Sequence, residues 1–100
     1  MQHPELAREK AITTAMNELW QGVQALIDGD LIVLAEGRSL LAILEAALAA
    51  LTAGDAPAAR ARAAEFGERA QALLASGLAE PRETRPLIEA AAAIVAALSG

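Results

Sequence analysis

The chain has 100 residues, enough for one domain with a single modest core, and 55% of its residues are hydrophobic. The net charge of −5 and the scattered Lys and Arg residues argue against a nucleic-acid-binding surface, and the absence of cysteine excludes disulfides and thiolate metal ligands. The first ten residues lack the pattern of a secretory signal, and no apolar run approaches the ~20 residues that span a bilayer. We therefore expect a soluble, cytoplasmic protein without nucleic-acid or membrane partners.

Alanine-rich composition, with little Val, Ile or Thr and no Tyr, favours helices over strands. The dipeptide Gly-Asp occurs at Gly29–Asp30 and at Gly54–Asp55, each time between apolar stretches. Glycine suits the left-handed residue that ends a helix, and aspartate suits the N-cap that begins the next one. The two pairs therefore predict two tight turns between antiparallel helices.

The first expected helix covers residues 4–28, with Pro4 in its first turn. Its apolar residues alternate in spacings of three and four, as expected of a face that packs on a neighbouring helix. This seam comprises Ile12, Met16, Leu19, Val23 and Leu26, widened by Trp20 and Ile27.

The second expected helix covers residues 31–53 and is apolar around most of its circumference. Its predicted seam comprises Leu34, Gly37, Leu41, Leu44, Leu48 and Leu51, and a second apolar stripe comprises Leu40, Ile43 and Ala47. The face left for water is narrow and comprises Arg38, Ala42, Glu45, Ala49 and Thr52. Such a helix needs neighbours on two sides, so it is either central or carries a binding groove.

The third expected helix covers residues 56–76, with a seam of Ala59, Ala63, Phe66, Ala70 and Leu73. The fourth is expected over residues 84–98, because a helix begun at Pro81 would contain Pro86, whose ring clash costs about 3 kcal/mol. The prediction is an all-α, antiparallel up-down-up-down four-helix bundle forming one domain over residues 1–100. The last helix is short, alanine-rich and loosely connected, so we expect it to detach first.

Few residues suggest chemistry. Gly22 and Gly37 are predicted at one level of the first hairpin, where they allow close packing, make room for Trp20, or open a ligand slot beside Arg38. A di-metal site would need Glu-x-x-His pairs, and the only histidine is His3. We expect no metal site, no cofactor and no catalytic residues, since no nucleophile has a partnered histidine and no phosphate-binding loop is present. The carboxylates considered as metal ligands were Glu36, Glu45, Glu65 and Glu68.

The stretch "LIDGDLIVLAEGRSLLA" resembles the first helix of the all-helical chorismate mutases. The matching residues are Asp28, Leu31, Ile32, Leu34, Ala35, Glu36, Arg38, Leu41 and Ala42. Where that family has an arginine and a lysine that hold the dicarboxylate substrate, this chain has Gln21 and Ala49. The resemblance therefore carries over only Arg38.

The stretch "MNELWQGVQALIDGDLIVLAEGRSLLAILEAALAAL" resembles the flagellar and type III export chaperones. The matching residues are Asp30, Leu34, Arg38, Leu41 and Leu44. Those proteins are small, often acidic helical bundles that bind an amphipathic segment of an export substrate. In some of them the last helix masks the binding surface.

The leading expectation is a non-enzymatic protein-binding module, a chaperone or adaptor that captures an amphipathic helix. In it, the last helix is a displaceable lid over the second stripe of residues 31–53 and the alanine face of residues 56–76. The expected partner-binding residues are Trp20, Leu40, Ile43, Ala47, Phe66 and Ala70. The alternatives are a structural homodimer, and a chorismate-mutase-like enzyme or small-molecule binder.

Overall fold

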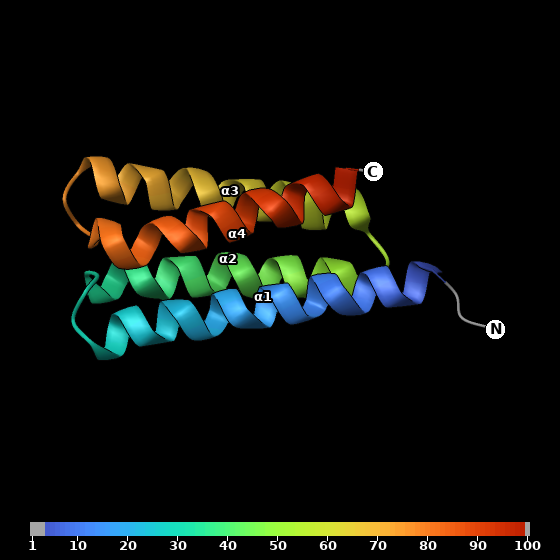
Figure 1. Ribbon diagram of the computed structural model, residues 1–100, viewed down its shortest axis with the longest axis horizontal. Coiled ribbons are helices and arrows are strands. Elements are labelled where there is room, and N and C mark those ends of the chain that lie inside the picture. The colour runs from blue at the N-terminus through green and yellow to red at the C-terminus, as the bar shows by residue number, and fades with distance from the viewer. Residues whose placement is uncertain (1–3, 100) are drawn as a thin grey trace.

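The computed structural model describes the backbone of residues 4–99 and the side chains of residues 10–99, and this part of the chain is all-α. Four helices lie side by side along a molecule of 47 × 20 × 20 Å (Figure 1). They are α1 (Pro4–Asp28), α2 (Leu34–Thr52), α3 (Ala56–Ala75) and α4 (Pro81–Ser99).

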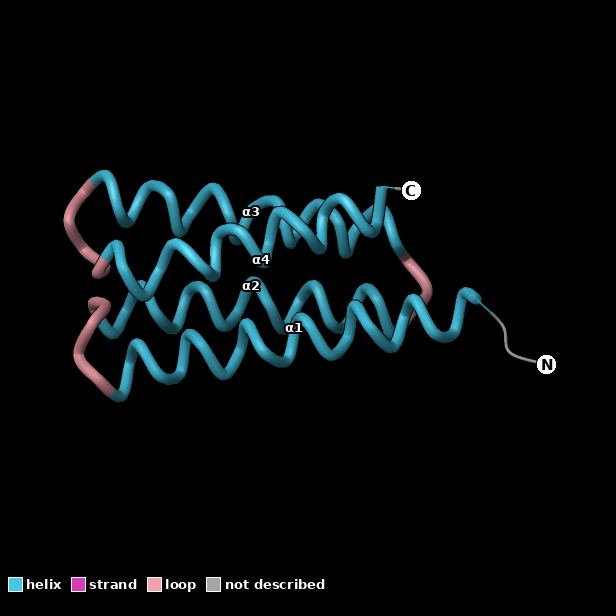
Figure 2. The backbone as a smooth tube through the Cα atoms, viewed as in Figure 1, coloured by secondary structure: helices cyan, strands magenta, loops and turns pink. Residues whose placement is uncertain are grey.

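Each helix packs lengthwise against two neighbours. The contacting pairs are α1 with α2, α2 with α3, α3 with α4, and α4 with α1, so α4 lies diagonal to α2. The α1–α2 and α3–α4 connections lie at one end of the molecule, and the α2–α3 connection lies at the other (Figure 2). We call the first of these the paired-loop end, formed by residues 29–33 and 76–80.

The core follows the predicted seams of α1 and α3 and departs from that of α2. Every predicted seam residue of α1 and α3 is buried. In α2 the buried residues are Gly37, Leu40, Leu44 and Ala47, while Leu34 is 49% exposed. Because α2 packs against both α1 and α3, the middle of its wide apolar face points into the core. Of the predicted seam, Gly37 and Leu44 belong to this buried part, and the remaining leucines are partly buried or exposed.

The corner between α2 and α3 has the predicted geometry. Gly54 has a φ of +80°, and the backbone N–H of Ala58 donates to Oδ1 of Asp55 at 3.2 Å. The N–H of Gly54 donates to Leu51 O and that of Asp55 to Ala50 O, the pair of bonds that defines a Schellman motif. Glycine ends one helix here and aspartate caps the next.

The corner between α1 and α2 has the same Schellman bonds in a different register. The N–H of Asp30 donates to Ile27 O and that of Leu31 to Leu26 O, so the left-handed residue is Asp30, with a φ of 56°, and not Gly29. Asp30 thus occupies the place that Gly54 has at the other corner, and it does not cap α2. The predicted roles of Gly29 and Asp30 at this corner are therefore wrong. Helix α1 ends at Asp28, one residue later than it would if Gly29 were the left-handed residue.

The chain next runs extended, and α2 begins at Leu34 instead of the predicted Leu31. Ile32 forms an antiparallel bridge with Ala79 in the α3–α4 connection. The N–H of Val33 donates to Leu78 O at 3.3 Å, and that of Glu80 donates to Leu31 O at 3.0 Å. The connection before α4, predicted to be loose, is therefore tied to the α1–α2 corner.

Helix α4 begins at Pro81 and contains Pro86, contrary to the predicted start near residue 84. Pro81 suits the first helical position, and the N–H of Thr84 donates to Glu80 O, so the first turn forms. Pro86 removes one backbone hydrogen bond, and its exposed position leaves the freed carbonyl within reach of water. Burial of Ala91 and Ile94 offsets that loss.

Candidate functional site

The residues expected to bind a partner are mostly part of the core. Leu40, Ala47, Phe66 and Ala70 are buried, and Trp20 and Ile43 are partly buried. Helix α4 packs on α3 and α1 and makes no lengthwise contact with α2. The expected arrangement, with α4 laid over the second stripe of α2, is therefore not found.

The expected ligand slot between Gly22 and Gly37 is filled by side chains. A Cβ built on Gly22 would lie 2.5 Å from Cδ2 of Leu87, and one built on Gly37 would lie 2.6 Å from Cγ1 of Ile27. Gly22 thus makes room for α4, and Gly37 makes room for the end of α1. Neither glycine accommodates Trp20, and Arg38 is exposed on α2.

The carboxylates considered as metal ligands do not gather. Glu36 accepts from Arg69 of α3 at 3.2 Å, and Glu65 accepts from Arg62 at 2.8 Å. Residues 10–99 contain no group of three His, Cys, Asp or Glu side chains that could hold a metal ion, and His3 lies outside the described residues. The ion pair between Arg69 and Glu36 links α3 to α2. The pattern of residues within a single helix does not predict such a pair.

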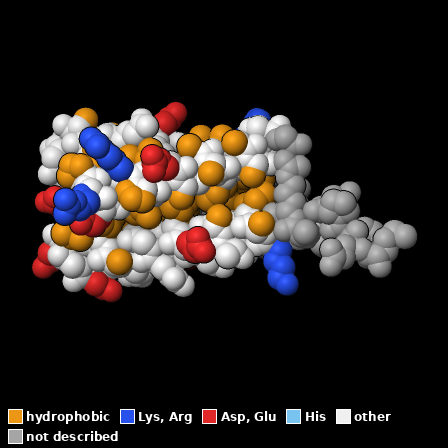
Figure 3. Space-filling view, in the orientation of Figure 1, with side chains coloured by type: hydrophobic (Ala, Val, Ile, Leu, Met, Phe, Trp, Pro, Cys, Tyr) orange, Lys and Arg blue, Asp and Glu red, His pale blue; other side chains and the backbone are white. Residues whose placement is uncertain are grey.

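The paired-loop end carries the most exposed apolar surface. Val33, Leu34 and Leu78 are the large hydrophobic side chains that are exposed among residues 10–99, at 47%, 49% and 40%. The hydrogen bond between Val33 and Leu78 brings them together, and we call these three residues the loop-end patch. On the face drawn in Figure 3, hydrophobic side chains reach the surface at this end beside charged ones.

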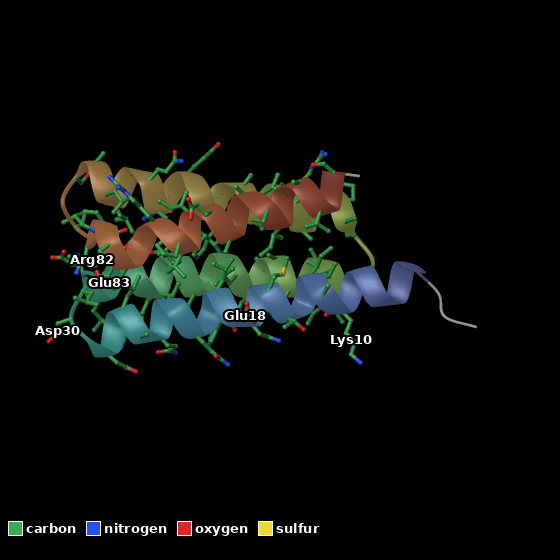
Figure 4. All side chains as sticks on the ribbon, viewed as in Figure 1. Lys10, Glu18, Asp30, Arg82 and Glu83 are labelled. Carbon is green, nitrogen blue, oxygen red and sulfur yellow. The ribbon has the colours of Figure 1, made fainter. Side chains whose placement is uncertain are left out.

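A hollow of about 410 Å³ lies within this end, lined by residues 30–34 and 77–80. Its lining includes all of the loop-end patch and the carboxylates of Asp30 and Glu80. Figure 4 shows Asp30 projecting from the same end as Arg82 and Glu83. The hollow therefore combines aliphatic residues with two acidic residues that belong to no ion pair among residues 10–99.

The sequence contains a signal for this site in two aliphatic stretches that lie next to turns. Leu31–Leu34 is a run of four large aliphatic residues immediately after a turn, and Leu78 follows the turn residue Gly77. The helix predicted over residues 31–53 places this run in its first turn, with Leu34 as a seam residue. The tertiary pairing of the two connections was needed to bring the residues together.

A second, smaller hollow of about 270 Å³ lies between α3 and α4. Small and aliphatic side chains line most of it: Ala63, Ala64, Gly67, Ile88, Ala92 and Val95, together with Glu68 and Gln71. Gly67 differs from Gly22 and Gly37, because a Cβ built on it meets only Ala91 at an ordinary 3.9 Å. Packing inside the molecule therefore does not require glycine at this position.

Comparison with protein-family models, with curated proteins and with solved structures finds no match. The resemblances to chorismate mutases and to export chaperones therefore stay predictions. Among the described residues, no helix is long and apolar enough to cross a membrane. What the protein does has to be argued from its own surfaces.

Proposed function

We propose that this protein is a non-enzymatic protein-binding module of the chaperone or adaptor class, built on an antiparallel up-down-up-down four-helix frame. The observation that supports the proposal is the loop-end patch. Three large aliphatic side chains lie exposed together, whereas the other large hydrophobic side chains of residues 10–99 are buried or partly buried. Clustered exposed apolar side chains on a small protein are typical of an interaction site.

In this proposal the helices stay closed and the partner docks at the paired-loop end. The exposed members of the loop-end patch are held by backbone hydrogen bonds between two connections, so the surface is preformed. A preformed surface loses less conformational entropy on binding than one that must open. The expected partner residues in the core, such as Leu40 and Phe66, then support the frame instead of touching the partner.

A photo-crosslinking amino acid at position 34 or 78, in protein expressed in its native cells, tests the proposal. We expect discrete crosslinked species from both positions. The control is the same amino acid at Ala49, an exposed position on α2 outside the patch. Equal crosslinking from position 49, or none from positions 34 and 78, would contradict the proposal.

A second experiment distinguishes docking on the closed four-helix structure from the mechanism predicted from the sequence, in which the partner displaces α4. The Cβ–Cβ distance of 3.9 Å between positions 67 and 91 suits a disulfide, and the chain has no other cysteine. A Gly67→Cys, Ala91→Cys variant would lock α4 to α3 when oxidised. We expect crosslinking from position 34 to be the same in the oxidised and reduced forms, whereas a displaceable α4 requires it to disappear on oxidation.

A structural homodimer is a second candidate, supported by a different observation. Gly67 sits in the middle of α3, where glycine costs about 1 kcal/mol relative to alanine, without an internal contact that explains it. A helix of a second copy could approach closely along the α3–α4 hollow. Sedimentation at several concentrations tests this, and Ala92→Glu should then dissociate the dimer.

A further inference from the structure

The hollow at the paired-loop end has a one-sided charge. Asp30 and Glu80 line it and are exposed, and no Lys or Arg lines it. The ion pairs among residues 10–99 join Arg62 to Glu65 and Arg69 to Glu36, so neither Asp30 nor Glu80 belongs to one. Arg82 lies beyond the hollow, at the start of α4 (Figure 4).

The backbone around the hollow is extended rather than helical. Hydrogen bonds flank the pair formed by Ile32 and Ala79, which makes it a non-hydrogen-bonded antiparallel pair. In such a pair the N–H and C=O groups of both residues point away from the opposite segment. These groups suit an extended peptide, whose own backbone groups are free to pair with them.

A second copy of this chain is a poor occupant of the same surface. Two copies meeting there would bring Asp30 and Glu80 of each against the same residues of the other. Each copy also carries a net charge of −5, so the whole molecules repel. Charge complementarity favours a cationic partner.

We infer that the loop-end patch binds an extended segment of a partner protein that presents aliphatic side chains and Lys or Arg side chains together on one face. The aliphatic side chains pack on Val33, Leu34 and Leu78, and the basic side chains pair with Asp30 and Glu80. This inference rests on the proposed protein-binding function and adds the chemistry of the partner. Successive side chains of an extended chain point to opposite sides, so the aliphatic and basic residues that face the hollow occupy every second position of the segment.

The test uses the intact protein and three capped peptides of about eight residues, long enough for one strand. In the first peptide Val, Lys and Leu occupy every second position with Ser between them, in the second Ser replaces each Lys, and in the third Glu replaces it. Binding is measured by fluorescence anisotropy at low and high salt. The protein variants are Asp30→Asn with Glu80→Gln, and Leu34→Ser with Leu78→Ser.

A charge-matched control, Glu18→Gln with Glu45→Gln, removes two exposed carboxylates outside the hollow. We expect the Lys peptide to bind most tightly and the Glu peptide not to bind. Asp30→Asn with Glu80→Gln should weaken the Lys peptide roughly fivefold, as expected for two exposed ion pairs, and added salt should weaken it similarly. The control variant should bind like the unaltered protein.

Three outcomes would overturn the inference. If the Ser peptide binds as tightly as the Lys peptide and Leu34→Ser with Leu78→Ser abolishes both, the patch binds proteins but its charge preference is wrong. If the control variant loses as much affinity as Asp30→Asn with Glu80→Gln, the attraction is to net charge and not to this hollow. If none of the peptides binds and sedimentation shows a dimer that salt strengthens and that Leu34→Ser with Leu78→Ser dissociates, the patch takes a second copy and the partner-binding function fails as well.

Discussion

The two Gly-Asp corners share a dipeptide and differ in structure. At the α2–α3 corner Gly54 is the left-handed residue and Asp55 caps the next helix. At the α1–α2 corner Asp30 is the left-handed residue, no side chain caps α2, and residues 31–33 pair with residues 78–80 instead. The first corner is therefore stabilised by local hydrogen bonds, and the second by contacts between segments far apart in the sequence.

The largest effect should come from breaking the paired corner through Ile32, which is 6% exposed. Ile32→Ala should lower the free energy of unfolding by about 3 kcal/mol, because it removes a buried side chain and leaves a cavity. Urea unfolding followed by Trp20 fluorescence measures it. Val33→Ala, at the exposed neighbour, should change stability by less than about 0.5 kcal/mol. Similar losses for the two variants would mean that the bridge is not packed on the core.

The next effect concerns the residue that adopts the left-handed conformation. Gly54→Ala should lower the free energy of unfolding by about 1–2 kcal/mol, since its φ of +80° is strained for any residue with a Cβ. Gly29→Ala should cost much less, because Gly29 does not have a positive φ. Thermal unfolding by circular dichroism compares the two. A larger loss at position 29 would mean that the register of the first corner is wrong.

A cap is expected at one corner only. Asp55→Ala should lower stability by about 1 kcal/mol, because it removes the acceptor for the N–H of Ala58. Asp30→Asn, which keeps a residue tolerant of the left-handed conformation, should have little effect in the same urea titration. Equal losses would indicate that Asp30 also caps a helix.

Next to the paired-loop end, α4 contains a buried polar atom without a hydrogen-bond partner among the described residues, the hydroxyl of Thr84. Thr84→Val should raise stability by about 1 kcal/mol, because burying an unpaired hydroxyl is unfavourable and a methyl group takes its place. Thr14→Val is the control, since the Thr14 hydroxyl donates to Lys10 O and its loss should not be stabilising. Destabilisation by Thr84→Val would show that a partner for the hydroxyl exists.

The smallest change in stability is expected from a substitution that gives both corners glycine as the left-handed residue. Asp30→Gly should raise stability by about 0.5 kcal/mol, since glycine adopts the left-handed conformation at lower cost than aspartate. The same change removes a carboxylate from the hollow, so binding of the Lys peptide should weaken while stability rises. A gain in both properties would contradict the role inferred for Asp30.

Local sequence patterns were sufficient for much of the fold. The spacing of Ile12, Met16 and Leu19 predicted the buried face of α1, and Ala59, Ala63 and Phe66 predicted that of α3. These helices each have one narrow apolar stripe, so periodicity alone identifies what is buried. For α2 it did not, because two apolar stripes leave open which of them faces the core.

The site depended on contacts that no local pattern encodes. Val33 and Leu78 are far apart in the sequence, and the hydrogen bonds between their connections make them one surface. The same pairing places the start of α2 at Leu34 and lets α4 begin at Pro81. By itself the sequence determined the four helices and the Gly54–Asp55 corner, because helical periodicity and capping act within a few residues. Only the tertiary structure decided the form of the other corner, the side of α2 that is buried and the place of the exposed patch, because each depends on which distant segment lies alongside.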